Sequence, residues 1–428
     1  MDSSSQIQPT NKKLKLSLNN EDDEDHHTIH EEYFGLKDLP NDVILNILIK
    51  LPISSLIQFR LVCKPWKLLS IHPDLHRLHQ SAAANDDPTL LFHSDYPIRN
   101  HLSFVELSSD CDRDDDCKIV RKIYTPFSGS MPEFNVVGSC NGLLCLSDSL
   151  YGEPVFLFNP FSMDYLELPK SKQFQEQEVL FGFGFHPDSN EYKVVKIVYY
   201  RTWQGRRRII RKNRNYPKSE VQILTISKQI DDKSCSWRCL GKVPYLLDKQ
   251  ATEGPVVNGR IHWVSRPGRI TGVPGRAIVS FDLKDELFKV VAKPSHAVVN
   301  RGNNYHLAAI KGCLAVVISC GYGKLEIWVM KEYDRKESWV KEFVIHGAFP
   351  AKVVSHEHRD YGIWRWRSGG RMVRVLCVLK NGEILMEYRG GSLVKYDPKW
   401  KEFKDVVFNR MPKLFRTIVH VGTLNWVR

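Results

Sequence analysis

Apolar residues near the N-terminal end of the sequence recur at helical spacing. Val43, Ile44, Ile47, Leu48 and Leu51 follow one another at i, i+1, i+4, i+5 and i+8. This spacing places them on one side of an α-helix, because an α-helix has 3.6 residues per turn. The pattern predicts an amphipathic helix that ends near Leu51.

Two more short helical segments follow. Pro52 ends the first helix, and Ser54 or Ser55 can cap the next one. The apolar stripe of that second helix is Leu56, Phe59 and Val62. A third turn or helix is expected to face inward through Trp66, Leu68 and Leu69 and to end at Pro73. Residues 39–75 are therefore predicted to form three small helices, too few to enclose a large core.

From Thr89 onward the helical period disappears, and short apolar runs alternate with Gly, Asn, Pro and Asp. A unit recurs in this part, and each copy begins with a tight turn. The turns are Asn141-Gly142, Asn258-Gly259, Lys311-Gly312 and Asn381-Gly382. Each turn is followed by two or three predicted strands, the second of which begin at Val155, Ala277, Leu325 and Ser392. A degenerate copy, starting with the run FGFGFHP, fills residues 181–244.

A β unit repeated at this length is typical of propeller blades, each of which buries its faces against its neighbours. Residues 89–127 are expected to form a further blade, and residues 415–421 to return as a strand that completes the ring. We predict an α+β multidomain chain, with three helices followed by an all-β propeller-like domain of about six blades. A two-sheet β-sandwich is the alternative.

The expected division of the chain follows from these patterns. Residues 1–34 are polar and acidic and are expected to be disordered. Residues 35–80 are expected to form the helical domain, 81–88 a linker, and 89–428 the β domain. No run reaches the roughly 18 apolar residues of a membrane span. The formal net charge of +12 bears on solubility and acidic partners rather than on fold.

The helical segment resembles an F-box. Its landmarks occur in the family's order as Leu39-Pro40, Leu51-Pro52 and Val62-Cys63-Lys64-Pro65-Trp66. In that family the motif docks on a Skp-type adaptor, which joins it to a cullin-based ubiquitin ligase. The resemblance implies an adaptor-binding set of Leu39, Pro40, Val43, Ile44, Ile47, Leu48, Leu51, Pro52, Leu56, Phe59, Val62 and Trp66. The pattern does not separate residues that contact the adaptor from residues that pack internally.

The β domain resembles the F-box-associated, kelch-like domain of plant F-box proteins. The matching runs are Ser139–Cys145, Phe158–Pro160, Phe181–Pro187 and Tyr192–Val195. In that family the domain is taken to present the substrate. The resemblance implies a substrate-recognition subunit of a Skp–cullin–F-box ubiquitin ligase that is not itself an enzyme. The alternatives are an F-box protein without ligase activity, and a propeller that binds carbohydrate or nucleic acid.

Two stretches depart from the family and are candidates for binding the target protein. The insert at 201–218 is strongly basic, and 356–371 mixes tryptophan with arginine. Arg binds phosphate and carboxylate oxygens well, and Trp and Arg are enriched at interface hot spots. The candidate residues are Trp203, Arg206, Arg207, Arg208, Arg211, Trp364 and Trp366. Solvated loops are the alternative, and nucleic-acid binding is disfavoured because no DNA or RNA module surrounds them.

The sequence predicts no cofactor and no metal site. The ten cysteines form no C-x-x-C pair, and Cys235 and Cys239 lack a histidine partner at zinc-finger spacing. We expect reduced, mostly buried thiols in a protein of the nucleus, the cytoplasm or both. Gly182 and Gly184 are not followed by the Lys-Ser/Thr of a phosphate loop. They are expected to mark a strand that neighbouring backbone approaches closely.

Overall fold

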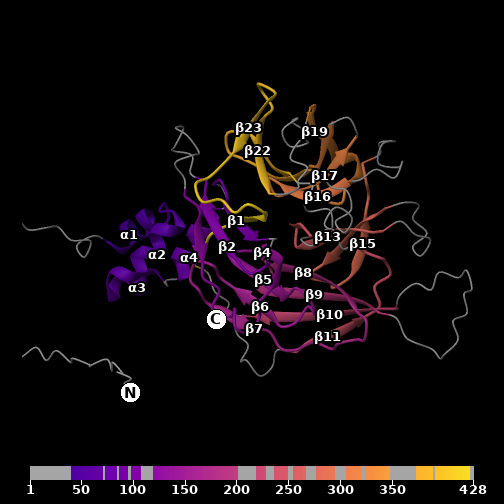
Figure 1. Cartoon of the computed structure of the whole chain (residues 1–428), viewed down its shortest axis with the longest axis horizontal. Helices are drawn as coiled ribbons and strands as arrows, with labels where there is room; N and C mark the ends of the chain where they lie inside the picture. The colour runs from indigo at the N-terminus through magenta and orange to yellow at the C-terminus, as the bar shows by residue number, and fades with distance from the viewer. Residues whose placement is uncertain are drawn as a thin grey trace, which may run out of the picture. The chain divides into compact units, whose positions relative to one another are not determined.

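The computed structural model describes residues 40–70, 73–83, 86–94, 98–107, 119–200, 218–227, 236–248, 254–266, 276–294, 305–320, 324–347, 373–388 and 391–424 (Figure 1). The chain forms two compact units, residues 1–44 and residues 45–428. The described part of the first unit is Pro40 and the beginning of helix α1. In the described part of the chain, no helix has the length and apolar character needed to cross a membrane.

The helical segment contains four helices rather than the predicted three. They are α1 (Asn41–Leu48), α2 (Ile53–Val62), α3 (Lys64–Ser70) and α4 (Pro73–Ala83). Pro73 was expected to end the third helix, yet it is the first residue of α4. A proline is tolerated there because the first turn of a helix leaves its N–H groups unpaired anyway. Helix α4 extends to Ala83 and so includes the first residues of the stretch expected as a linker.

Six four-stranded antiparallel sheets follow, and we call them blades 1 to 6. Blade 1 is β24 (Phe415–His420), β1 (Thr89–Ser94), β2 (Leu102–Glu106) and β3 (Arg121–Ile123). Blade 2 is β4 (Phe134–Cys140), β5 (Leu143–Asp148), β6 (Val155–Phe158) and β7 (Tyr165–Glu167). Blade 3 is β8 (Glu178–His186), β9 (Glu191–Tyr200), β10 (Lys218–Ser227) and β11 (Arg238–Gly241).

The remaining three blades repeat this order along the chain. Blade 4 is β12 (Val256–Val257), β13 (Arg260–Val264), β14 (Ile278–Asp282) and β15 (Phe288–Val291). Blade 5 is β16 (Tyr305–Ile310), β17 (Cys313–Ser319), β18 (Leu325–Met330) and β19 (Trp339–Ile345). Blade 6 is β20 (Val373–Val378), β21 (Ile384–Tyr388), β22 (Ser392–Asp397) and β23 (Glu402–Val406). The predicted six-bladed propeller is confirmed, and the sandwich alternative is wrong.

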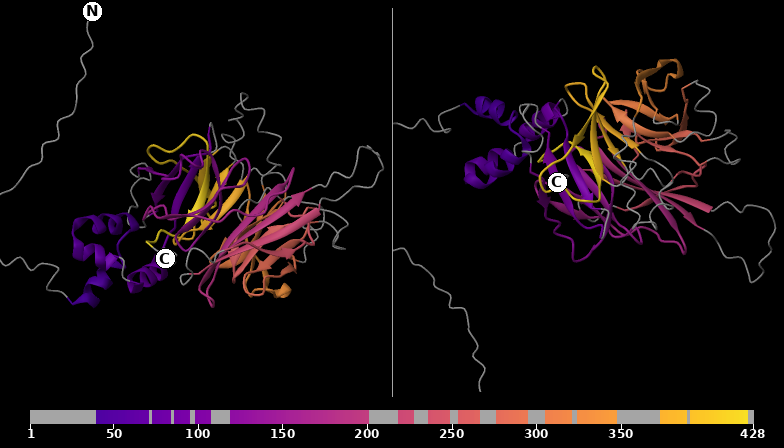
Figure 2. Two further views of the ribbon diagram at one scale, coloured as in Figure 1. Left: turned by 90° about the horizontal axis from the view of Figure 1, so that it is seen from below. Right: turned by 45° about the horizontal axis from the view of Figure 1, so that its top comes forward.

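The ring is closed by the last strand of the chain, as predicted. Strand β24 pairs antiparallel with β1, so that Thr89 lies opposite His420 and Ser94 opposite Phe415. In Figure 2 the yellow C-terminal strands lie beside the purple strands of blade 1. Blade 1 therefore combines the first and last strands of the propeller, and it completes the ring only when both are present.

The predicted turns also form, although they lie one strand later in each blade than expected. Asn141 and Gly142 have φ values of 48° and 80°, and Asn258 and Gly259 have 51° and 66°. These turns join the first strand of a blade to its second, so the sequence pattern had missed the first strand. In blade 4 the first strand carries little signal, because β12 has only two residues.

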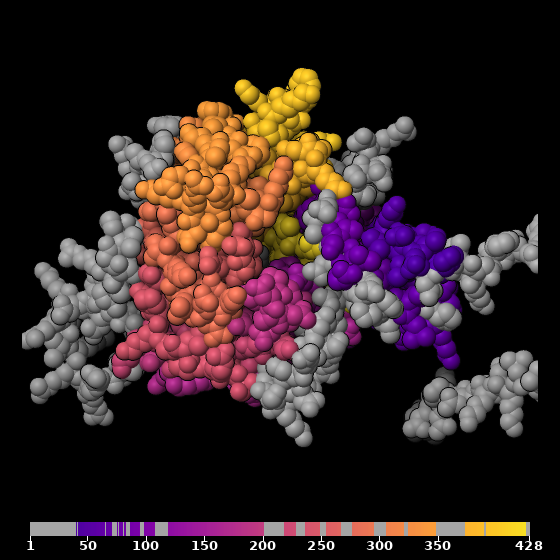
Figure 3. Space-filling view, turned by 180° about the vertical axis from the view of Figure 1, so that it is seen from behind, coloured from indigo at the N-terminus to yellow at the C-terminus, as the bar shows by residue number. Residues whose placement is uncertain are grey.

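The core of the propeller lies between neighbouring blades. Its apolar clusters each combine residues of two sheets that follow one another around the ring. Figure 3 shows neighbouring sheets in direct contact, with the colours passing from magenta through orange to yellow. Trp263 of blade 4 is fully buried against blade 3.

The close approach expected at Gly182 and Gly184 is present, but side chains rather than backbone make it. A Cβ at Gly182 would lie 2.6 Å from the Trp263 ring, and one at Gly184 would lie 2.8 Å from the Leu283 side chain. Both neighbours belong to blade 4. These glycines therefore admit large side chains of the next blade.

Candidate adaptor-binding surface

The buried side of the helices holds part of the predicted adaptor-binding set. Ile44, Leu48, Leu56 and Phe59 are buried. The Phe59 ring stacks on the half-buried Trp66 of α3, with 4.2 Å between ring centroids and 15° between planes. Trp66 therefore holds α3 against α2, and these residues serve the packing of the helices.

Other apolar side chains of the same helices project into solvent. The exposed fraction is 46% for Ile47, 60% for Val62, 82% for Leu61 and 66% for Leu68. Val43, one turn before Ile47 on α1, is also exposed. Leu68 was predicted to face inward, which is wrong. On α3, Trp66 already occupies the inward position, and a residue two places further along a helix points to a different side.

Leu61 was missed by the sequence analysis. The predicted stripe of α2 followed Leu56, Phe59 and Val62, and Leu61 lay outside that stripe. A helix of ten residues with three buried positions cannot hide a fourth large side chain on its other side. The spacing carried no signal of this exposure, because adjacent residues lie only about 100° apart around a helix and the width of the covered face decides which of them is buried.

The other predicted residues of the set fall into three groups. Pro40 and Pro52 are exposed, and Leu51 is half-buried. Leu39 lies outside the described residues. The structure thus divides the predicted set into residues that pack internally and residues that are open to a partner.

Positive charge predominates around the exposed apolar residues of α2 and α3, whereas α1 carries the exposed carboxylate Asp42 beside Val43. Residues 45–70 contain four cationic side chains and no carboxylate. The four cations are Lys50, Arg60, Lys64 and Lys67. Like-signed cations around apolar residues favour a partner surface that is apolar at its centre and acidic at its edge, because opposite potentials steer association and suppress wrong partners.

Helix α2 is anchored to the propeller by a carboxylate. Glu106, at the end of β2, accepts hydrogen bonds from the backbone N–H of Ser54 at 3.3 Å and from the Ser54 hydroxyl at 2.6 Å. Ser54 was expected to cap α2 with its own side chain. Instead a carboxylate of blade 1 lies at the N-terminus of the helix, where the helix dipole favours negative charge.

Two more contacts support the beginning of α2. The His79 ring on α4 lies 3.0 Å from the carbonyl oxygen of Leu51. Ile53 is buried, and its side chain packs closely on Gly422. A Cβ added at Gly422 would lie only 2.9 Å from the Ile53 side chain. Gly422 follows β24, so α2 begins against the closing blade of the ring.

The second predicted set, the target-binding residues of the two basic stretches, lies outside the described residues. These are Trp203, Arg206, Arg207, Arg208, Arg211, Trp364 and Trp366. The strand ends that border the stretches are described. Tyr200 ends β9 and Lys218 begins β10, whereas Ile345 ends β19 and Val373 begins β20.

These strand ends lie on one face of the ring. In antiparallel blades the first and third turns share one face, while the second turn and the connection between blades share the other. Gly422 follows the inner strand β24 at the face of the first turns, which is the face where α2 begins. The bordering strand ends therefore lie on the face opposite α2.

The cysteines show no sign of an activated nucleophile among the described residues. Burial raises the pKa of Cys140 and of Cys377 to about 12, and it also raises the pKa of Cys145. The expectation of buried thiols is met at Cys140, Cys145 and Cys377 but not at Cys63 and Cys239, which are exposed. No group of metal-binding side chains is found in the described part of the chain.

The sequence and fold define a class of protein. Residues 36–78 match the F-box domain family, and residues 91–424 match the F-box associated beta propeller domain family. The chain belongs to the F-box proteins that carry this propeller domain. An F-box domain implies binding to a Skp-type adaptor, and F-box proteins are generally adaptors rather than enzymes.

Individual relatives are plant proteins. The chain is 48% identical to F-box protein At3g07870 of Arabidopsis thaliana over 92% of its own length and 93% of that protein. It is 26% identical to F-box protein CPR1 of Arabidopsis thaliana, over 90% of this chain and 88% of the relative. F-box/kelch-repeat protein At3g23880 of the same species is 25% identical, over 74% and 82% of the two chains.

Proposed function

We propose that this protein is the substrate-recognition subunit of a Skp–cullin–F-box ubiquitin ligase. The observation that supports this best is the set of exposed apolar side chains on the F-box helices, Ile47, Leu61, Val62 and Leu68. Helices that are already folded against blade 1 gain nothing from these side chains in isolation. Binding an adaptor would bury these side chains and remove their apolar surface from water. The surrounding cations favour an adaptor surface with acidic residues at its edge.

The proposed mechanism is proximity rather than bond chemistry. The propeller holds a target protein while the cullin complex delivers ubiquitin to the target's lysines, which raises the effective concentration of the reacting groups. This chain then acts as a receptor without a catalytic residue of its own. The opposite-face position of the strand ends next to the basic stretches supports a target site turned away from the adaptor. We propose the nucleus, the cytoplasm or both as the place of action.

The adaptor contact is tested by reversing the exposed apolar surface. Leu61→Glu/Leu68→Glu is expected to lower affinity for a purified plant Skp-type adaptor at least a hundredfold, measured by biolayer interferometry. The thermal unfolding midpoint should stay unchanged, because both side chains are solvent-exposed. Leu150→Glu is the matched control, since Leu150 is equally exposed in the turn after β5 of the propeller. Wild-type affinity in the double variant would overturn the proposed surface.

Ligase activity is tested separately from adaptor binding. The wild-type chain, reconstituted with adaptor, cullin, RING protein and charged conjugating enzyme, is expected to acquire ubiquitin on its own lysines. The Leu61→Glu/Leu68→Glu variant should not. A chain that binds the adaptor and yet supports no ubiquitin transfer would favour an F-box protein acting without ligase activity.

A further inference from the structure

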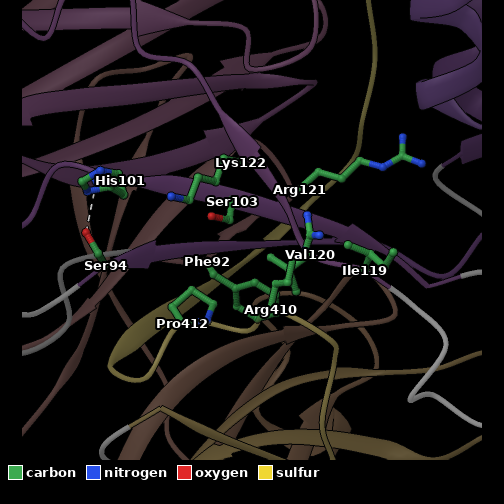
Figure 4. Close-up of a pocket in the computed structure, with 10 residues that line it drawn as sticks. All are labelled: Phe92, Ser94, His101, Ser103, Ile119, Val120, Arg121, Lys122, Arg410 and Pro412. Carbon is green, nitrogen blue, oxygen red and sulfur yellow. Dashed lines mark hydrogen bonds between the residues drawn. The ribbon is translucent and has the colours of Figure 1, made fainter.

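A crevice opens on the outer part of the ring between blade 1 and the connection from β23 to β24. Its volume is about 540 Å³, within the range of small-molecule sites. Ten residues line it, as Figure 4 shows: Phe92, Ser94, His101, Ser103, Ile119, Val120, Arg121, Lys122, Arg410 and Pro412. No carboxylate is among them.

The strand register explains why the crevice is apolar inside and polar outside. Phe92 lies opposite Ser103, and Ser103 lies opposite Lys122, so the three side chains share one face of blade 1. Phe92 and Val120 are buried and belong to the cluster between blades 1 and 6. The cluster ends before the outer strand β3. On the same face of the sheet, the Ser103 hydroxyl and the Lys122 ammonium group follow it.

The second wall is a loop held in place by backbone contacts. Asn409 forms a parallel bridge with Ile119, and its carbonyl oxygen accepts a hydrogen bond from the Val120 N–H at 3.0 Å. The Met411 N–H donates to the carbonyl oxygen of Phe408 at 3.2 Å. Arg410 lies between these two bonds with a φ of 64°. The position of this arginine at the crevice is therefore set by the fold.

Among the residues that the structure describes, no carboxylate balances the positive charge at this crevice. Lys122 and Arg410 are exposed, and neither forms an ion pair with a residue that the structure describes. Arg121 precedes Lys122 on β3, and successive side chains of a strand point to opposite faces of the sheet. Figure 4 accordingly shows the Arg121 side chain extending away from the others. Lys122 and Arg410 are therefore both available to bind an anionic ligand beside the apolar lining. The Ser103 hydroxyl lies on the same face of blade 1, on the strand between those of Phe92 and Lys122.

We propose that this crevice binds a phosphate monoester carried on a small apolar body. Two cations match a dianionic head, and a guanidinium and an ammonium both bind phosphate oxygens. Ile119, which is 49% exposed, and the half-buried Pro412 supply the apolar surface for the body of the ligand, with the buried Phe92 and Val120 behind them. The site lies on the propeller, and it stands or falls independently of adaptor binding by the F-box helices.

The test uses the full chain and phenyl phosphate as the probe, with inorganic phosphate and phenol beside it. Isothermal titration is expected to show phenyl phosphate binding more tightly than inorganic phosphate, and phenol not binding. Affinity should fall as salt rises, because the exposed charges are screened. A short peptide with a central phosphotyrosine identifies the source. Equal affinity assigns the site to a side chain of a partner protein, and exclusion of the peptide assigns it to a free ligand.

Two variants remove the cations without harming the fold. Lys122→Gln keeps the aliphatic stem, and Arg410→Asn places a residue that tolerates positive φ at this position. Each is expected to weaken phenyl phosphate binding about tenfold or more, with an unchanged unfolding midpoint. The matched control is Lys289→Gln, because Lys289 is an exposed lysine on β15, the outer strand of blade 4. Equal binding by all three variants would show an adventitious anion only and overturn the proposal.

Carboxylates near the crevice in sequence could compete with the probe for the two cations, so the titrations also need a variant that lacks them. Five aspartates lie between residues 110 and 116, outside the described residues: Asp110, Asp112, Asp114, Asp115 and Asp116. The titrations are therefore repeated with all five changed to asparagine, so that these carboxylates cannot compete with the probe. Failure of phenyl phosphate to bind in both backgrounds would also overturn the proposal, while adaptor affinity, measured in parallel, should stay the same throughout.

Discussion

In the helices between Leu45 and Ala83, Leu61 and Leu68 project large apolar side chains into solvent, whereas the inner strands of all six blades are lined with buried residues. The difference follows from size. Four short helices have too little interior to enclose every apolar residue, and a ring of sheets gives each blade a neighbour on both sides. Exposed apolar residues therefore mean different things in the two regions. On the helices they form the proposed adaptor-binding surface, and on the propeller they are scattered single side chains.

The largest expected effect comes from breaking ring closure. Ile418→Asp places a carboxylate at a buried position of β24, and we expect a loss of about 4 kcal/mol or more in the free energy of unfolding. Urea denaturation followed by tryptophan fluorescence measures it. Val340→Asp is the matched control, because Val340 is exposed on the outer strand β19, and it should cost less than about 0.5 kcal/mol. Similar losses in both variants would mean that closure does not dominate the stability of the ring.

Acid is expected to weaken the propeller through His262. This side chain is buried, with Nε2 at 2.7 Å from the Tyr333 hydroxyl and Nδ1 at 3.1 Å from the carbonyl oxygen of Pro255. Burial, with a smaller contribution from the charge of Arg260, lowers the pKa of His262 from 6.5 to about 4. The folded state therefore holds this ring neutral at pH values where the unfolded state has already bound a proton.

The direction of the pH effect follows from that difference. The stability contributed by neutral His262 is fully present above about pH 6.5 and is lost as the pH falls towards about 4, by on the order of 3 kcal/mol. His262→Gln should flatten this part of the curve of unfolding free energy against pH. His346→Gln, at an exposed histidine, should leave the slope of the wild type. A slope unchanged by His262→Gln would refute the assignment.

Adding a single methyl group between blades 3 and 4 is expected to lower the stability of the propeller. Gly182→Ala places a Cβ 2.6 Å from the Trp263 ring, so we expect a loss of about 1–3 kcal/mol in the free energy of unfolding. The control is Gly129→Ala, where a Cβ meets no atom within 4 Å. That change should be neutral or slightly stabilising. Equal unfolding midpoints for the two variants would show that blades 3 and 4 can shift apart without cost.

The smallest effect concerns the contact between the two regions. Ser54→Ala removes the hydroxyl that donates to Glu106, and we expect a cost of about 1 kcal/mol. A double-mutant cycle with Glu106→Gln should give a coupling energy of similar size. Ser81→Ala, within α4, provides the comparison, because its hydroxyl bonds to the Arg77 carbonyl of the same helix. Additive effects of Ser54→Ala and Glu106→Gln would mean that the carboxylate does not anchor α2.

The fold was predictable wherever local patterns carry it. The glycine-containing turns, the strands that follow them and the returning strand at 415–421 all rest on short-range signals, and they led to the right number of blades. The first strands of blades 2, 4, 5 and 6 were missed because their residues lie before the turn and next to the ring axis, which is a tertiary feature, whereas β24 of blade 1 and β8 of blade 3 were predicted. Leu68 was placed inward for the same reason, since spacing alone does not say which side of a short helix faces its neighbours.

The site was predictable as a motif but not as a surface. The landmarks from Pro40 to Trp66 indicated an adaptor-binding segment, and burial then separated Leu56 and Phe59 from Val62. Leu61 and the contact of Glu106 with Ser54 required the structure, because they depend on where blade 1 lies against α2. The cationic crevice combines residues from three strands and a distant loop, and no stretch of sequence joins them.

The ring cannot close until the ribosome has made β24, the last strand of the chain. Thr89 and His420 pair across about 330 residues, and at roughly 5–20 residues per second the ribosome needs roughly 20–60 s to make that length. Throughout that interval β1 has a free edge and its buried residues Leu90 and Phe92 lack part of their cover. An unpaired apolar edge of this kind is prone to pair wrongly with other chains. Production of this protein therefore depends on protecting β1 until the last strand emerges.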